Sequence, residues 1–146
     1  MTMKEKILET LRMMGFEVEE MEDFGYGFQY EGKNYLYMPN NEDEDFLSIS
    51  IPAVMDCDDV SNEVFYLLMD KLNSTLKYVK ANKLGDSMWL FYERELYGGE
   101  DLEKLLTHMI LHLEAGITFF RNLITSAIND DDSDGGTSAE GSEEVA

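Results

Sequence analysis

The spacing of apolar residues predicts a helix at the start of the chain. Four apolar side chains recur at helical intervals, namely Met3, Ile7, Leu11 and Met14. Thr2 followed three residues later by Glu5 forms a capping box, which marks the first turn of a helix. Gly15 follows the last apolar position and favours termination there. We therefore expect one helix over residues 3–14.

A different periodicity follows and predicts a β-hairpin. Aromatic side chains alternate with other residues at Phe24, Tyr26, Phe28 and Tyr30. Residues 31–34 include Gly32 and supply a turn, and residues 35–38 resume an aromatic strand. A third strand is expected over residues 46–52, in which Leu47, Ile49 and Ile51 alternate with Ser48 and Ser50. This alternation indicates a half-buried strand that ends at Pro52.

The second half of the chain predicts a helix, another hairpin and a long helix. The helix begins near Asp59 or Ser61, either of which could cap it, and ends around Asn73. Its buried stripe is expected to contain Val64, Leu67, Leu68 and Leu72. Strands are predicted over residues 76–81 and 88–96, joined through Asn82, Gly85 and Asp86. Gly98 and Gly99 then break the chain before a helix over residues 101–124.

These elements predict an α+β fold with the order α-β-β-β-α-β-β-α. Strands that arrive as hairpins favour an antiparallel sheet, with the helices packed against it. The chain has 146 residues, enough for one core, so we expect a single domain over residues 1–128. Residues 129–146 are rich in acid, Gly and Ser and nearly free of apolar side chains, which predicts a disordered acidic tail.

The last helix raises the question of chemistry, because His108 and His112 lie four residues apart. Steps of 100° direct one set of side chains at the sheet: Leu102, Leu106, Met109, Leu113, Ile117, Phe120 and Ile124. An adjoining flank carries Leu105, His108, His112, Phe119 and Leu123. The opposite side, expected to face solvent, carries Glu103, Thr107, Glu114, Thr118 and Arg121. The apolar surface is wider than one sheet contact needs, so the flank is a candidate interface.

Three interpretations of the two histidines stay open. A metal site needs further ligands, and Met109 occupies the position of the glutamate base of a metalloprotease. Alternatively, the rings pack at the border of the core with polar edges in water. In the third interpretation they lie within a subunit or partner interface. We expect no metal and no cofactor; if a metal is bound, His108 and His112 are the candidate ligands, with a further ligand from elsewhere in the chain, such as Cys57 or an acidic residue.

The aromatic strands admit two interpretations as well. Their side chains could form the face of the sheet that lies under the helices, since aromatic residues suit strands. They could instead form an uncovered binding surface for a peptide, in which case Tyr26 and Tyr30 are candidate contact residues.

Charge narrows the possible partners. The net charge is −20, from 31 acidic and 11 basic residues, which disfavours nucleic acid and anionic lipid. No apolar run has the length of a membrane span, and the charged start MTMKEKILET does not resemble a signal peptide. One cysteine, Cys57, allows no internal disulfide. We expect a cytoplasmic protein whose partners are other proteins with neutral or basic segments.

No catalytic motif stands out. Asp56, Asp58 and Asp59 surround Cys57 and should raise the pKa of its thiol, which makes it a poor nucleophile. The acidic runs NNEDED and DCDD resemble solvated loops more than acid and base pairs. Glycine-rich phosphate loops, nucleophile elbows and CxxC pairs are missing from the sequence. We therefore predict a protein that is not an enzyme.

The stretch DKLNSTLKYVKANKLGDSMWLFYEREL followed by EDLEKLLTHMILHLEAGITFFRNLI resembles the YbjN-type family, which shares the fold of type III secretion chaperones. The similarity is one of element order over most of residues 2–125. It implies a homodimer that holds an extended segment of another protein, or a regulator, and it implies no catalytic residues. The expected function is a non-enzymatic, chaperone-like or regulatory binding module; the alternative is a small metal-binding protein or metal-dependent enzyme that uses the two histidines.

Overall fold

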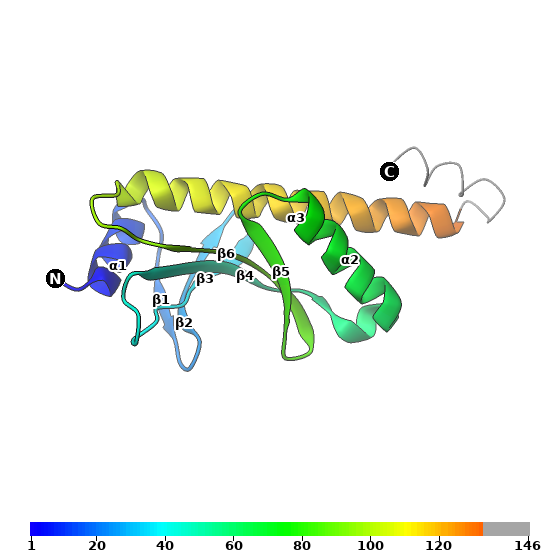
Figure 1. Ribbon diagram of the computed structural model, residues 1–146, viewed down its shortest axis with the longest axis horizontal. Helices are drawn as coiled ribbons and strands as arrows, with labels where there is room; N and C mark the ends of the chain where they lie inside the picture. The colour runs from blue at the N-terminus through cyan, green and yellow to red at the C-terminus, as the bar shows by residue number, and fades with distance from the viewer. Residues whose placement is uncertain (133–146) are drawn as a thin grey trace.

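The computed structural model describes residues 1–132 and shows one antiparallel sheet with helices on one of its faces (Figure 1). The elements in chain order are α1 (Met3–Met13), β1 (Glu19–Met21), β2 (Gly25–Tyr30), β3 (Lys33–Tyr37), β4 (Phe46–Asp56), the 3-10 turn η1 (Cys57–Asp59), α2 (Asn62–Thr75), β5 (Val79–Leu84), β6 (Ser87–Glu95) and α3 (Leu102–Asp132). The predicted α+β class and the order of its elements are confirmed, with one additional strand. Within the described residues no helix is both long enough and apolar enough to cross a bilayer.

The sheet has the strand order β1-β2-β3-β4-β6-β5, and every neighbouring pair is antiparallel. The two longest strands, β4 and β6, lie side by side and pair from Phe46↔Glu95 to Asp56↔Ser87, with an irregularity between Ile51 and Met55. Pro52 lies in this interval, and Ala53 has a positive φ of 49°. The sequence predicted that this strand ends at Pro52. It continues past the proline because Pro52 lies in a bulge, where its missing N–H is not needed for pairing with β6.

The strand β1 was not predicted. It contains only Glu19, Glu20 and Met21, all exposed, and pairs with Gly25–Gly27 of β2. Three residues, two of them acidic, give neither an alternating pattern nor a β-rich composition. Phe24 lies in the turn before β2 and is exposed, although the alternation had placed it in the strand.

The helices keep their predicted starts, but two of the later boundaries differ. Ser61 caps α2 by accepting a hydrogen bond from the Val64 amide at 3.2 Å. Strand β5 begins at Val79 and not at residue 76, because Leu76 is the C-cap of α2 and Tyr78 has a left-handed φ of 69°. Helix α3 continues to Asp132, since no glycine or proline follows Ile124 before Gly135. The predicted tail over 129–146 overlaps this helix at 129–132, and its remainder lies outside the described residues.

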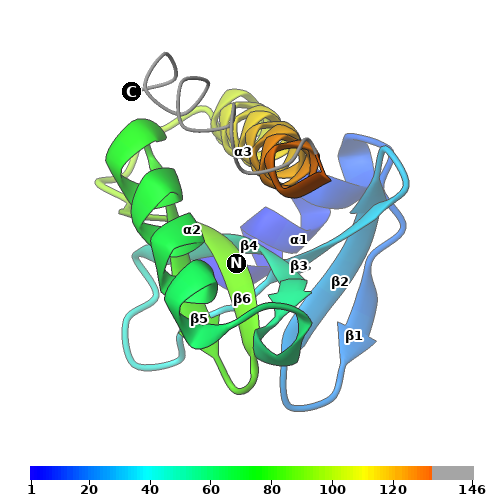
Figure 2. The same cartoon turned by 90° about the vertical axis from the view of Figure 1, so that its right-hand side faces the viewer.

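The main core lies between the helices and one face of the sheet. Figure 2 looks along α3 and shows this helix above the strands, with α1 and α2 at different sides of it. The core includes Ile7, Leu8 and Leu11 of α1, Phe65, Leu68 and Leu72 of α2, and Leu106, Met109, Leu113, Ile117 and Phe120 of α3. The predicted sheet-facing side of α3 is therefore confirmed. A Cβ on Gly116 would lie 3.4 Å from a methyl carbon of Leu76, the C-cap of α2, and 3.5 Å from one of Val79 in β5, so this glycine lets α3 approach both closely.

The opposite face of the sheet carries a smaller apolar cluster of Leu36, Trp89 and Phe91, with Met38 packed against it. The indole of Trp89 stacks on the ring of Phe91 with centroids 5.9 Å apart. Ser48 and Ser50 lie on this face and are buried, and the Ser48 hydroxyl donates to Glu93 at 3.1 Å. Strand β4 is thus buried on both faces over these residues, where the sequence had predicted burial on one face.

The edge strand β5 is protected by a side chain of α2. The Asn73 amide group donates from Nδ2 to the carbonyl oxygen of Ala81 at 3.0 Å and accepts at Oδ1 from the Ala81 amide. One side chain therefore occupies the positions that another strand would take at this point of the edge. It also fixes the end of α2 against the sheet.

We predict that Asn73→Ala lowers the free energy of unfolding by about 1–3 kcal/mol, because both backbone groups of Ala81 lose a partly buried partner. Urea denaturation followed by circular dichroism measures the change. Asn122→Ala, at an exposed position of α3, is the matched control and should alter stability by less than about 0.5 kcal/mol. Equal effects of the two substitutions would show that the Asn73 contacts contribute nothing.

Candidate functional site

The two histidines of α3 meet two tyrosines at the junction with β5 and β6. The Tyr92 hydroxyl of β6 lies 3.0 Å from Nδ1 of His108. The imidazole rings of His108 and His112 are 3.9 Å apart between centroids and inclined by 32°. The ring of Tyr78 stacks on that of Tyr92 at 5.6 Å and meets each imidazole edge-on at 5.1 Å. We call His108, His112, Tyr78 and Tyr92 the imidazole–tyrosine cluster.

Hydrogen bonding fixes the tautomer of one imidazole. Nδ1 of His112 lies 2.9 Å from the backbone carbonyl oxygen of His108. A carbonyl oxygen only accepts, so Nδ1 of His112 carries the proton and donates it. The Nε2 atom of a neutral His112 therefore has a free lone pair. The Tyr92 hydroxyl can either donate to Nδ1 of His108 or accept from it, so His108 keeps both tautomers available.

The imidazole–tyrosine cluster lies on the flank of α3 that the sequence analysis singled out as a candidate interface. Leu105 is only 9% exposed, and His108, His112, Phe119 and Leu123 are half-buried. Strand β6 and the connection before β5 supply the covering side chains Tyr92 and Tyr78. The Tyr78 side chain is itself 61% exposed. The structure thus brings His108 and His112 together against Tyr78 and Tyr92 of the same chain. The other three flank residues, Leu105, Phe119 and Leu123, belong to the main core or pack against it.

Burial has a chemical effect at this cluster. Desolvation lowers the pKa of the His108 imidazole, and the neighbouring His112 and Arg94 lower it further because they disfavour a second positive charge. Desolvation likewise raises the pKa of the Tyr92 hydroxyl, and Tyr78 adds to this effect. Both side chains are therefore held in their neutral forms near neutral pH.

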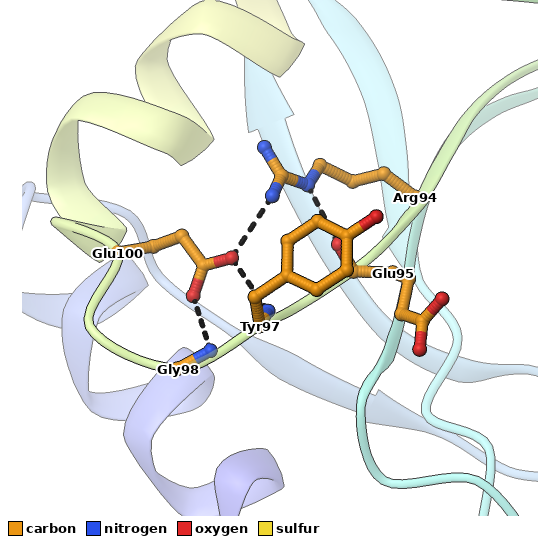
Figure 3. Close-up of polar contacts among 5 residues, drawn as sticks. All are labelled: Arg94, Glu95, Tyr97, Gly98 and Glu100. Carbon is orange, nitrogen blue, oxygen red and sulfur yellow. Dashed lines mark hydrogen bonds and ion pairs between the residues drawn. The ribbon is translucent and has the colours of Figure 1, made fainter.

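Arg94 is fixed by the turn that precedes α3. Figure 3 shows Glu100 accepting hydrogen bonds from the Arg94 guanidinium at 2.9 Å and from the backbone amides of Tyr97 and Gly98 at 2.7 and 2.9 Å. These hydrogen bonds, that of the Tyr97 amide first, lower the pKa of the Glu100 carboxyl. The carboxylate shapes the turn, and Asp101 then accepts from the Lys104 amide to cap α3.

The opposite flank of α3 corrects one prediction. Glu114 was placed on the solvent side, but its carboxylate accepts from the Tyr35 hydroxyl at 2.8 Å and pairs with Lys33 at 2.9 Å. The side chains of Lys33 and Glu114 are 15% and 18% exposed. The helical periodicity correctly places residue 114 outside the core stripe. It does not show that Lys33 and Tyr35 of β3 lie beside the helix at this position. Burial, and then Glu114, raise the pKa of Tyr35.

The aromatic strand residues lie on the helix-facing side of the sheet. Phe28, Tyr35 and Tyr37 are buried in the main core, and Tyr26 and Tyr30 are half-buried against it. Lys4 of α1 lies 5.4 Å from the centroid of the Tyr26 ring. Burial raises the pKa of Tyr37 to about 12. Of the two interpretations, the structure shows the first, an aromatic face under helices; a contact role for the partly open Tyr26 and Tyr30 stays a prediction.

Two apolar side chains of α2, Val64 and Leu67, are exposed, although the sequence had predicted their burial. Leu67 is 59% and Val64 is 39% exposed, whereas Phe65, Leu68 and Leu72 form the buried stripe. Tyr66 is exposed as well. The sequence did carry a signal for this exposure: residues 64–68 are all apolar or aromatic and so surround most of the helix, whereas a surface helix buries only one side. The predicted stripe combined residues of both sides.

A groove of about 770 Å³ runs beside the short strand β1. Its lining includes residues 15–19, Met21, Gly27, Gln29, Asn34, Leu36 and Pro52. Two carboxylates, Glu17 and Glu19, belong to the lining, and no lysine or arginine does. Gly27 leaves space for the Met21 side chain in the groove lining, since a Cβ on Gly27 would lie 3.3 Å from that side chain. The groove is thus partly apolar and negatively charged.

Within the described part of the chain, the remaining candidate residues, Cys57 and the acidic side chains, do not form a site. Cys57 lies in η1, half-buried, with Sγ 3.9 Å from the Asp58 carboxylate. Among residues 1–132 no group of three or more His, Cys, Asp or Glu side chains is placed to hold a metal ion.

Neither a protein-family model nor a curated protein sequence matches the chain, so the similarity to YbjN-type proteins stays a prediction.

We predict that His108 titrates below the ordinary histidine pKa of about 6.5. Because the folded protein then binds fewer protons than the unfolded chain, stability falls as the pH drops through that ordinary value. NMR titration of the imidazole C–H signals measures the midpoint, and His108→Gln, which removes one of the two signals, assigns it. A midpoint of 6.5 or higher for His108 would contradict the half-buried, hydrogen-bonded environment of this imidazole.

Proposed function

We propose that this protein is a non-enzymatic protein-binding module, chaperone-like or regulatory, that acts as a homodimer. The observation that carries the proposal is the exposure of Leu67, Val64 and Tyr66 on one short segment of α2. Apolar side chains gathered on the open side of a helix are typical of a surface that another protein covers. The flank of α3 supports the proposal less strongly, because Tyr78 and Tyr92 already lie against His108 and His112.

The positions of Glu63 and Lys71 on α2 favour a second copy of the chain as the protein that covers this surface. Glu63 and Lys71 lie four residues before and four residues after Leu67. If two α2 helices pack antiparallel about a two-fold axis at Leu67, Lys71 of each subunit meets Glu63 of the partner subunit. A self-complementary surface of this kind is what a two-fold dimer requires. The apolar residues then meet at its centre, where binding energy concentrates.

The groove beside β1 supplies a separate place for a partner segment. It is open, partly apolar and carries the carboxylates of Glu17 and Glu19. An extended segment with apolar and basic side chains complements this lining, and the net charge of −20 favours the same partners over long range. Since β1 is the edge of the sheet, such a segment would also lie next to unpaired backbone groups.

We predict that Leu67→Glu weakens self-association by about tenfold or more, because it places an unpaired charge at the centre of the interface. Sedimentation equilibrium of the full chain measures the dissociation constant. Leu111→Glu is the matched control, since Leu111 is 50% exposed on α3 and should leave association unchanged. Equal dissociation constants for the two variants, or a monomeric wild type at high micromolar concentration, would contradict the dimer.

Charge reversal tests the antiparallel arrangement in the same assay. Glu63→Lys and Lys71→Glu should each weaken the dimer, whereas the double substitution restores both ion pairs and should recover most of the association. A double variant weaker than either single variant would exclude this geometry.

For the groove, we predict that peptides selected from a displayed random library are enriched in apolar and basic residues. Exchanging both Glu17 and Glu19 for lysine should weaken the selected peptides by about tenfold, measured by fluorescence anisotropy. Glu22→Lys, at an exposed position outside the lining, is the control. Enrichment of acidic peptides, or affinity that survives the double exchange but not the control, would contradict the assignment.

A further inference from the structure

The imidazole–tyrosine cluster leaves one nitrogen of each histidine available. Both Nδ1 atoms are engaged, by the Tyr92 hydroxyl and by the His108 carbonyl. No described residue forms a hydrogen bond with either Nε2 atom, and no buried side-chain nitrogen or oxygen in the described chain lacks a partner. The two Nε2 atoms are therefore in contact with solvent, on neighbouring rings whose centroids are 3.9 Å apart.

We propose that His108 and His112 bind one divalent transition-metal ion through their Nε2 atoms, with solvent completing its coordination. Imidazole nitrogen suits Cu²⁺, Ni²⁺ and Zn²⁺, and histidines at positions i and i+4 of a helix face the same ion. This inference is independent of the proposed protein-binding function.

The hydrogen bonds at Nδ1 fit this role. A histidine that binds a metal usually donates its other ring nitrogen to a carbonyl, a carboxylate or water, which fixes the ring and leaves the ligating lone pair free. His112 has this arrangement, with Nδ1 donating to a backbone carbonyl oxygen. His108 attains it when Nδ1 donates to the Tyr92 hydroxyl. Each ring is thus held at Nδ1 by its own chain, and its Nε2 atom stays available.

Two features set the strength of the site. Metal–nitrogen distances of about 2.0–2.1 Å require the ring centroids to separate by roughly 1 Å, and the exposed Tyr78 ring at their edges is free to yield. The positive charge of Arg94 lies nearby, but the guanidinium is paired with Glu100 at 2.9 Å. With two protein ligands the site is open, in keeping with the lack of a three-residue cluster in residues 1–132. Affinity should follow the order of Cu²⁺ above Ni²⁺ and Zn²⁺.

The test is calorimetric titration of the tag-free full chain with Cu²⁺, Ni²⁺ and Zn²⁺, in millimolar magnesium to occupy carboxylates. We expect one ion per chain, tightest for Cu²⁺, and an affinity at least about tenfold lower in His108→Gln and in His112→Gln. Leu111→Gln, between the two histidines, is the control and should bind as the wild type does. Binding that persists in the double histidine variant, or no binding at all, overturns the proposal.

Electron paramagnetic resonance of the Cu²⁺ complex of the wild type gives an answer that needs no variant to fold. Hyperfine coupling to two imidazole nitrogens is expected. Coordination by oxygen alone would assign the ion to carboxylates and overturn the site.

Discussion

Helix α3 is held across the sheet by a tyrosine on each side, and the surfaces of the protein depend on this constraint. On one flank the Tyr35 hydroxyl donates to Glu114, and on the other the Tyr92 hydroxyl meets His108. These contacts fix how the apolar arc of the helix lies on the strands, in addition to the burial of Leu106, Met109 and Leu113. They also leave His108 and Glu114 half-buried, one on each flank of the helix. Three exposed apolar side chains, Val64, Tyr66 and Leu67, lie close together on α2 instead.

Much of the fold follows from periodicity in the sequence. The helical repeat of α1, the aromatic alternation of β2 and the core arc of α3 predict where these elements lie, because each has one face that must be buried. Strand β1 gives no such signal, since its three residues are exposed and are held only by pairing with β2. The late start of β5 depends on the left-handed backbone of Tyr78, which no local residue preference demands.

The candidate site was predictable in part and for a clear physical reason. Helical geometry places His108 and His112 on one flank beside Leu105, but only the tertiary structure shows that Tyr78 and Tyr92 come to lie against them. The burial of Glu114 could not be predicted for the same reason, because its partners Lys33 and Tyr35 are on β3, far away in the sequence. On α2 both sides of the helix carry apolar residues, so the pattern alone could not decide that Phe65 is buried and Leu67 exposed.

We propose that Leu105, His108 and His112 on the flank of α3 are covered within the chain, and that a second subunit covers the outer face of α2. Hydroxyl-radical footprinting of the full chain, read by mass spectrometry at low and high protein concentration, tests it most directly. We expect Leu105 to be unreactive at both concentrations, and Leu67 and Tyr66 to be reactive in dilute protein and protected in concentrated protein. Leu105 that reacts in dilute protein and becomes protected on concentration, with Leu67 unchanged, would contradict the account.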